Sequence, residues 1–144
     1  FEGLPPPSEQ DSLFDNEVWH HYADLFDEHM FDCKVSYQNV VENFSRYGFT
    51  ERDVRFIKGW VPDCLLGFSE PLAVVRIDVD WYRASLDSLN TIYDLVSSGG
   101  FIIVDDYKLE GCRQAVDEFF KAKKINSVLQ TADEKAGIVF WRKV

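Results

Sequence analysis

The chain has 144 residues, of which 46% are hydrophobic, and its 25 acidic residues exceed its 15 lysines and arginines to give a formal net charge of −10. This length and apolar content suit one domain over residues 1–144 with a buried core. The charge argues against a nucleic-acid backbone or an anionic membrane surface as partner, and no apolar run approaches the 18 residues of a membrane span.

The three cysteines, Cys33, Cys64 and Cys112, are widely spaced and form no Cys-x-x-Cys pair. An odd number of cysteines without paired spacing favours a reducing compartment over a disulfide framework, and it argues against zinc. No signal peptide is recognisable, so we expect a cytoplasmic protein. The chain begins with Phe1 and not with methionine, which suggests a piece of a longer protein.

The first third of the chain is expected to hold a loop and two helices. Residues 1–14 are rich in proline, serine and acids and lack periodicity, which predicts a loop. Apolar residues near helical spacing predict a helix over residues 17–30, with His20, His21 and His29 as surface residues. Ser36 is a plausible N-cap for a second helix that ends at Gly48.

Residues 53–60 are predicted to form a strand, because β-formers occupy the centre of the segment. The strand is expected to stop at Gly59, where the backbone can approach a ligand closely. Trp60 suits a core or lid position, and stacking on an adenine ring is the alternative. A short helix over residues 61–68 is expected to follow.

Residues 73–107 form the centre of the predicted fold, a strand–helix–strand unit. Residues 73–80 and 101–104 are apolar, β-branched runs that each end in acids, the pattern of buried parallel strands. Apolar residues at helical spacing predict a helix over residues 85–98, which Gly99 and Gly100 are expected to terminate. The two strands should therefore be parallel, with their carboxyl ends at the same edge of the sheet.

Four carboxylates follow these two strands: Asp78 and Asp80 after the first, and Asp105 and Asp106 after the second. Alternation along a strand points Asp78 and Asp80 to one crevice, with Asp105 or Asp106 opposite. Carboxylates this close repel one another unless a cation neutralises them, and magnesium prefers oxygen ligands. The alternative is that these acids are helix caps and solvated loop residues.

In the last third of the chain, the residue pattern predicts an amphipathic helix over residues 110–124, followed by strands over residues 127–131 and 137–141. The polar turn 132–135 between these strands suits a hairpin. An alternating βα chain that ends in an antiparallel hairpin predicts a mostly parallel α/β sheet with an antiparallel strand at one side.

With these elements in place, the chain resembles the macrocin O-methyltransferase (TylF) family of S-adenosylmethionine-dependent enzymes over nearly its whole length. The matching segments are residues 1–5 (FEGLP), 58–60 (KGW), 76–82 (RIDVDWY), 99–107 (GGFIIVDDY) and 111–117 (GCRQAVD). The two acidic motifs are specific as a pair, at this separation, and weak alone.

The resemblance implies a Rossmann-like methyltransferase fold and methyl transfer from S-adenosylmethionine to a hydroxyl of a sugar or other natural product, assisted by magnesium. Asp78, Asp105 and Asp106 match the metal ligands, and Asp80 matches the proposed general base. Tyr82 and Tyr107, which end the two motifs, suit packing better than a pocket wall.

In the family, the glycine-rich turn and the acid that hold the cofactor lie before the segment that matches Phe1. The chain is therefore expected to lack the first strands, with only Gly59 and Trp60 left for a cofactor contact. Open strand edges then predict a homo-oligomer. The alternatives are a non-catalytic α/β fragment that acts as an assembly or binding module and, less well matched, a magnesium-binding receiver domain, whose acid pair should lie near the start of the chain.

Overall fold

The structure is a computed structural model that describes Phe1, Gly3 and residues 8–11, 34–61 and 63–144. The predicted helix over residues 17–30, its three histidines, Cys33 and much of the predicted N-terminal loop lie outside the described residues. No helix in the described part of the chain is both long and apolar enough to cross a membrane.

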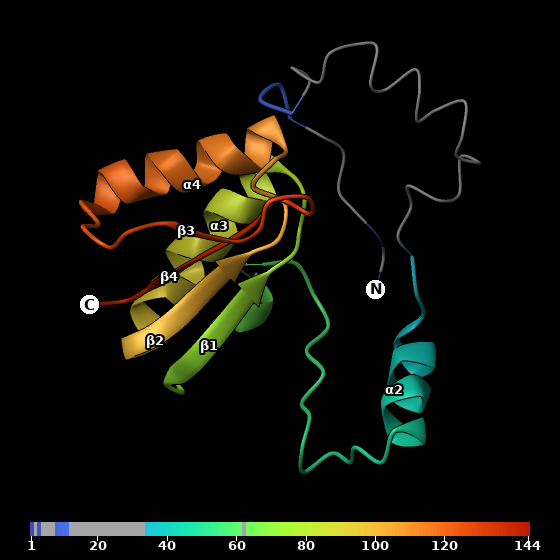
Figure 1. Cartoon of the computed structure of the whole chain (residues 1–144). Coiled ribbons are helices and arrows are strands. Elements are labelled where there is room, and N and C mark those ends of the chain that lie inside the picture. The colour runs from blue at the N-terminus through green and yellow to red at the C-terminus, as the bar shows by residue number, and fades with distance from the viewer. Residues whose placement is uncertain (2, 4–7, 12–33, 62) are drawn as a thin grey trace, which may run out of the picture.

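A four-stranded sheet forms the centre of the described fold (Figure 1). Its strands are β1 (Leu72–Ile77), β2 (Val96–Val104), β3 (Gln130–Asp133) and β4 (Ile138–Arg142), in the order β1-β2-β4-β3. The β1–β2 pair is parallel, and β4 runs antiparallel to both β2 and β3. The α/β prediction, with a parallel βαβ unit followed by an antiparallel C-terminal hairpin, is therefore confirmed.

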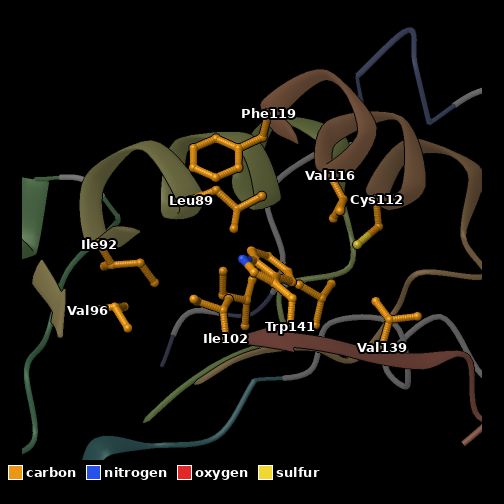
Figure 2. Packing of buried hydrophobic residues seen from close by; sticks show 11 residues of the cluster. Leu89, Ile92, Val96, Ile102, Cys112, Val116, Phe119, Val139 and Trp141 are labelled. Atoms are coloured by element: carbon orange, nitrogen blue, oxygen red, sulfur yellow. The ribbon is translucent and has the colours of Figure 1, made fainter. Parts of the chain in front are cut away.

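Helices α3 (Tyr82–Ile92) and α4 (Glu110–Lys123) cover one face of this sheet. Figure 2 shows Trp141, Ile102 and Val139 of the sheet directed towards side chains of the two helices. Leu89, Phe119 and Trp141 are at most 1% exposed, and each such side chain contributes about 1.5–3 kcal/mol by leaving water. The core thus lies between the helices and this face of the sheet.

The opposite face of the sheet is more open. Along β1 and β2, alternate residues point away from the helices. Among them, Val74 is 57% exposed and Phe101 is 38% exposed. Strand β1 is also an edge strand, since β2 is its only paired neighbour among the described strands.

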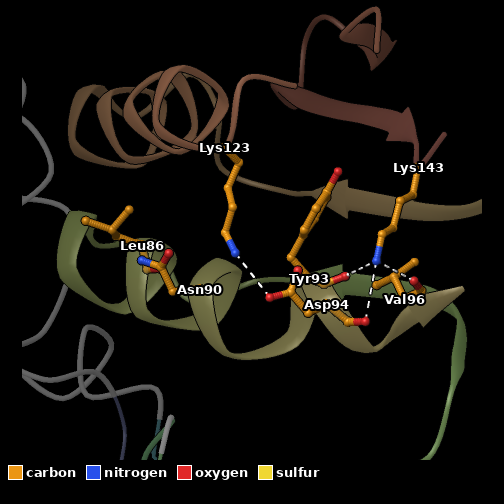
Figure 3. A network of polar contacts seen from close by, with 7 residues as sticks. All are labelled: Leu86, Asn90, Tyr93, Asp94, Val96, Lys123 and Lys143. Carbon is orange, nitrogen blue, oxygen red and sulfur yellow. Dashed lines mark hydrogen bonds and ion pairs between the residues drawn. The ribbon is translucent and has the colours of Figure 1, made fainter. Parts of the chain in front are cut away.

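The prediction that a helix runs to residue 98 and stops at Gly99 and Gly100 is wrong. Helix α3 ends at Ile92, a 3-10 turn η2 (Tyr93–Leu95) follows, and β2 already begins at Val96. The side chain of Lys143 holds the turn that follows α3, because its Nζ donates to the carbonyl oxygens of Tyr93 and Val96 at 2.8 and 2.7 Å (Figure 3). Lysine near a helix C-terminus satisfies carbonyls that the helix leaves open.

Both glycines lie inside β2, where neighbouring strands of the sheet approach closely. A Cβ on Gly100 would lie 2.8 Å from the carbonyl oxygen of Ala73 in β1, and Gly99 has a φ of +83°. The Gly99 carbonyl accepts from Arg142 Nε at 2.9 Å. These glycines therefore serve strand packing, and the β1–β2 register shifts beside them, between Leu72 and Val74.

Residues 53–60 do not form the predicted strand. They pair with no strand of the described sheet, and a strand exists only where its backbone finds a partner. Asp53 instead closes a turn by accepting from the backbone N–H and hydroxyl of Thr50 at 2.9 and 2.7 Å. The predicted helix over residues 61–68 is reduced to the 3-10 turn η1 (Asp63–Leu65).

The predicted second helix, the last helix and the C-terminal hairpin are present, although β3 spans residues 130–133 and not 127–131. Helix α2 (Tyr37–Arg46) begins after Ser36, whose hydroxyl accepts from the Asn39 N–H at 3.1 Å. Gly48 lies just beyond its end with a φ of +85°. Helix α4 ends one residue earlier than predicted, and the hairpin turn lies two residues later than predicted because Asp133 accepts from the Gly137 N–H at 2.9 Å.

Candidate functional site

The ends of β1 and β2 bring three of the predicted acids together. Ile77 pairs with Val104, and the Asp105 N–H donates to the Ile77 carbonyl at 3.0 Å, so the residues that follow each strand lie side by side. One carboxylate oxygen from each of Asp78, Asp105 and Asp106 lies within 4.8 Å of the other two. These three residues are here called the acid cluster.

Arg76 of β1 bridges two members of the acid cluster. Its Nη1 donates to Asp78 Oδ2, and its Nη2 donates to Asp105 Oδ2 at 2.7 Å. The hydrogen bond to Asp105 is the main cause of the raised pKa of Arg76. We did not predict this residue, although its position two residues before Asp78, on the same face of the strand, was the available signal.

The acid cluster retains oxygen atoms with no protein partner. Asp105 Oδ1 and Asp106 Oδ2 are buried and accept no hydrogen bond from the described part of the chain. Burying an oxygen without a hydrogen-bond partner destabilises the folded chain. All the possible metal ligands here are carboxylate oxygens, which magnesium and manganese prefer. The residues present therefore fit a divalent cation.

Burial and mutual repulsion oppose ionisation of these acids. Burial, followed by repulsion from Asp80 and then Asp78 and Asp105, raises the pKa of Asp106 to about 6. Burial is also the main cause of the raised pKa of Asp80, with repulsion from Asp78 and Asp105 next. A bound cation would oppose both effects by favouring the charged carboxylates.

Asp80 lies beyond the strand, in a different setting from the acid cluster. Because β1 ends at Ile77, the prediction that Asp80 belongs to the strand is wrong. Asp80 has a φ of +57°, a left-handed conformation that aspartate tolerates better than most residues. The backbone of Asp80 slightly opposes the rise in the pKa of Asp106. Asp80 is not one of the three residues grouped around the candidate cation position, and its role as a base stays a prediction.

The two tyrosines that end the acidic motifs are both held by α4. Tyr82 donates its hydroxyl to Glu118 Oε2 at 2.7 Å, and Tyr107 donates to Asp117 Oδ1 at 2.9 Å. Burial and the bond to Asp117 raise the pKa of Tyr107 to about 12. These contacts agree with the predicted packing role, since they fix the segments that carry the acids.

Asp11, which we did not predict, caps α3 from the N-terminal segment. Its Oδ1 accepts from the Tyr82 N–H at 2.7 Å, and its Oδ2 accepts from the N–H and hydroxyl of Ser8 at 2.8 and 2.6 Å. Trp81 at the N-cap position has an indole that can donate but not accept. Gly111 leaves the space for Asp11, because a Cβ there would lie 2.0 Å from Asp11 Oδ1.

The predicted cofactor residues, Gly59 and Trp60, line a small pocket of about 120 Å³ together with Phe1, Gly3 and Lys58. Gly59 has a φ of +145°, and a Cβ there would lie 2.6 Å from the Cβ of Cys64, so only glycine fits. Trp60 is 49% exposed. The volume is below the 300–1,000 Å³ typical of pockets for small molecules, so the described residues offer a partial site.

A βαβ sheet with carboxylates at the ends of parallel strands defines the class: a Rossmann-like α/β domain with a candidate cation site. The family model described as macrocin-O-methyltransferase (TylF) matches residues 1–143, and the chain belongs to this family. Among solved structures, the O-methyltransferase NovP superposes with a TM-score of 0.78 and 33% identity, over 99% of this chain and 57% of that one. The predicted methyltransferase fold is thereby confirmed.

Curated relatives of the chain are named as O-methyltransferases. The chain is 37% identical to mycinamicin III 3''-O-methyltransferase of Micromonospora griseorubida, over 99% of this chain and 54% of the relative. It is 34% identical to demethyldecarbamoylnovobiocin O-methyltransferase of Streptomyces niveus, over 99% and 52%. The calicheamicin methyltransferase CalS11, with a TM-score of 0.68 and 15% identity over 98% and 56% of the chains, shows the fold alone. The chain spans about half the length of the curated relatives it matches.

Proposed function

We propose that the protein transfers a methyl group from S-adenosylmethionine to a hydroxyl of a sugar or other natural product, with Mg²⁺ held by the acid cluster. Membership of the TylF family supports the reaction class. The observation that carries the proposal is the convergence of Asp78, Asp105 and Asp106, in which Asp105 Oδ1 and Asp106 Oδ2 are buried without a partner among the described residues. We also propose a cytoplasmic protein.

The proposed division of labour assigns each acid one task. A divalent cation, when bound, lowers the pKa of a coordinated hydroxyl and orients its oxygen. Asp78, Asp105 and Asp106 hold that cation. Asp80 removes the hydroxyl proton, and its raised pKa suits this role because a general base works best when its pKa approaches the operating pH. Tyr82 and Tyr107 keep the two acidic segments in place through α4.

Gly59 and Trp60 are proposed to contact the adenine end of S-adenosylmethionine. Gly59 lets the backbone approach a ligand, and the half-exposed Trp60 ring has a face available for stacking. Because the pocket in the described residues is small, we expect this chain alone to bind the cofactor weakly.

A second candidate function is that of a non-catalytic assembly module. It is favoured by the open edge of β1 and by the exposure of Val74 on the same strand. An unpaired edge with apolar side chains readily pairs with another chain. Self-association without cation binding would favour this candidate over the enzyme.

Calorimetric titration with Mg²⁺ or Mn²⁺ tests the cation site. Asp78→Asn, Asp105→Asn and Asp106→Asn should each weaken binding, because each loses a charged ligand. Glu134→Gln is the matched control, since it removes one charge from an exposed residue of the hairpin turn. Equal affinity in wild type and all three ligand variants would contradict the assignment.

The variant Asp80→Asn tests whether Asp80 acts as the general base or as a ligand of the cation. In the full-length enzyme, cation affinity should be kept while methyl transfer falls by about 10²- to 10⁴-fold, as is typical when a general base is lost. Asparagine tolerates the left-handed backbone at this position. If cation affinity were lost together with turnover, Asp80 would belong among the ligands.

A further inference from the structure

The two oxygens of Asp105 have different surroundings. Oδ2 accepts from Arg76 Nη2 at 2.7 Å, whereas Oδ1 is buried and has no partner among the described residues. Arg76 also binds only Oδ2 of Asp78. The guanidinium therefore binds one oxygen of each carboxylate, and in Asp105 the buried oxygen stays without a partner among the described residues.

The shape of the guanidinium fixes the two acids relative to each other. Its nitrogens form a rigid planar fork, so a pair of bonds from Nη1 and Nη2 sets the separation and the rotation of both carboxylates. Arg76 is itself held in β1, paired with Ile103 of β2. Both ligands are thus oriented before any cation binds.

Two effects of Arg76 on cation affinity have opposite signs. Its positive charge repels a cation, while its hydrogen bonds orient two ligands that would otherwise repel each other and rotate apart. The Arg76 side chain is 51% exposed, so solvent screens the repulsion. The orienting hydrogen bonds act at contact distance, 2.7 Å to Asp105, where screening is weakest.

We infer that Arg76 is a positioning residue that sets the carboxylates of Asp78 and Asp105 for cation binding. This inference rests on the proposed cation site. The guanidinium takes no part in the methyl transfer, and it acts only through the two acids. Residues that orient metal ligands in this way typically change metal affinity by 10- to 100-fold when they are replaced.

The test is a calorimetric Mn²⁺ titration of wild type, Arg76→Ala, Arg76→Lys and the control Arg83→Ala. The control removes an equal charge from an exposed ion pair with Asp87 on α3. We expect Arg76→Ala to bind Mn²⁺ about 10-fold or more weakly, and Arg83→Ala to bind as wild type does. Equal or tighter binding by Arg76→Ala would mean that repulsion dominates, and it would overturn the inference.

Arg76→Lys distinguishes orientation from space filling and remains informative if Arg76→Ala fails to fold. Lysine keeps the charge and an aliphatic stem but lacks the planar fork of nitrogens. The thermal stability of Arg76→Lys should therefore match that of wild type, while its Mn²⁺ affinity falls. Wild-type affinity in Arg76→Lys would overturn the inference. Absence of Mn²⁺ binding in wild type would instead overturn the cation site of the proposed function.

Discussion

Replacement of Asp106 by asparagine should stabilise the metal-free chain even though it weakens cation binding. Burial and three neighbouring carboxylates raise the pKa of Asp106 from 3.8 to about 6. Between those pH values the folded chain keeps a proton that the unfolded chain releases, so the free energy of unfolding falls as the pH rises from about 4 to about 6. Above pH 6 the ionised side chain lowers the free energy of unfolding by the full amount that corresponds to the pKa difference.

The difference between 3.8 and about 6 corresponds to about 3 kcal/mol. Asp106 is only half-buried, so solvent screening reduces the expected effect to about 1–2 kcal/mol. Asparagine has nearly the same shape and carries no charge. At pH 7.5, Asp106→Asn should therefore raise the free energy of unfolding by about 1–2 kcal/mol, or the melting temperature by roughly 3–8 °C.

Urea denaturation with EDTA at pH 4.5 and pH 7.5 measures this effect. The gain from Asp106→Asn should be present at pH 7.5 and much smaller at pH 4.5, whereas the control Glu134→Gln should change little at either pH. Mg²⁺ at 100 times its dissociation constant should then stabilise wild type by about 2.7 kcal/mol and the variant much less. Identical stability of wild type and Asp106→Asn at both pH values in EDTA would refute the reasoning.

Three further predictions concern stability and assembly. Asp11→Ala should lower the free energy of unfolding by about 1–2 kcal/mol because the cap on α3 is lost, and Asp11→Asn, which keeps an acceptor, should lose less; equal losses in urea denaturation would contradict the capping role. Tyr107→Phe should cost about 1 kcal/mol, and a double-mutant cycle with Asp117→Asn should give a smaller loss for the pair than the sum of the single losses; additive losses would show that the hydrogen bond contributes nothing. Light scattering should give a mass above that of a monomer, and Val74→Lys on the edge strand β1 should reduce it; a wild-type monomer at high concentration would argue against self-association.

Predictions that depend on local pattern agree well with the structure. Ser36 caps α2 as expected, because an N-cap hydroxyl bonds to a backbone N–H only three residues away. The acid cluster was also accessible from sequence: parallel strands place their carboxyl ends together, so Asp78 meets Asp105 and Asp106 once the βαβ unit is recognised.

The errors come from contacts made across long stretches of chain. Nothing near residue 92 indicates that Lys143 will bind the carbonyls of the turn that follows α3. Residues 53–60 have strand composition, but pairing depends on a neighbour that composition does not specify. Asp11 reads locally as one more acid in a polar loop, and its role emerges only when Tyr82 is beside it.

The cap on α3 also has a consequence for the order in which this region folds. Asp11 and Tyr82 are 71 positions apart, so the cap closes only after a long loop has formed. During synthesis, Asp11 leaves the ribosome well before Tyr82 exists, so the first turn of α3 gains this cap only after the two residues meet. Contacts of such high sequence separation form late and slow the search for the native state. Asp80 lies two residues before Tyr82, so the segment that carries the proposed base adjoins this long-range contact.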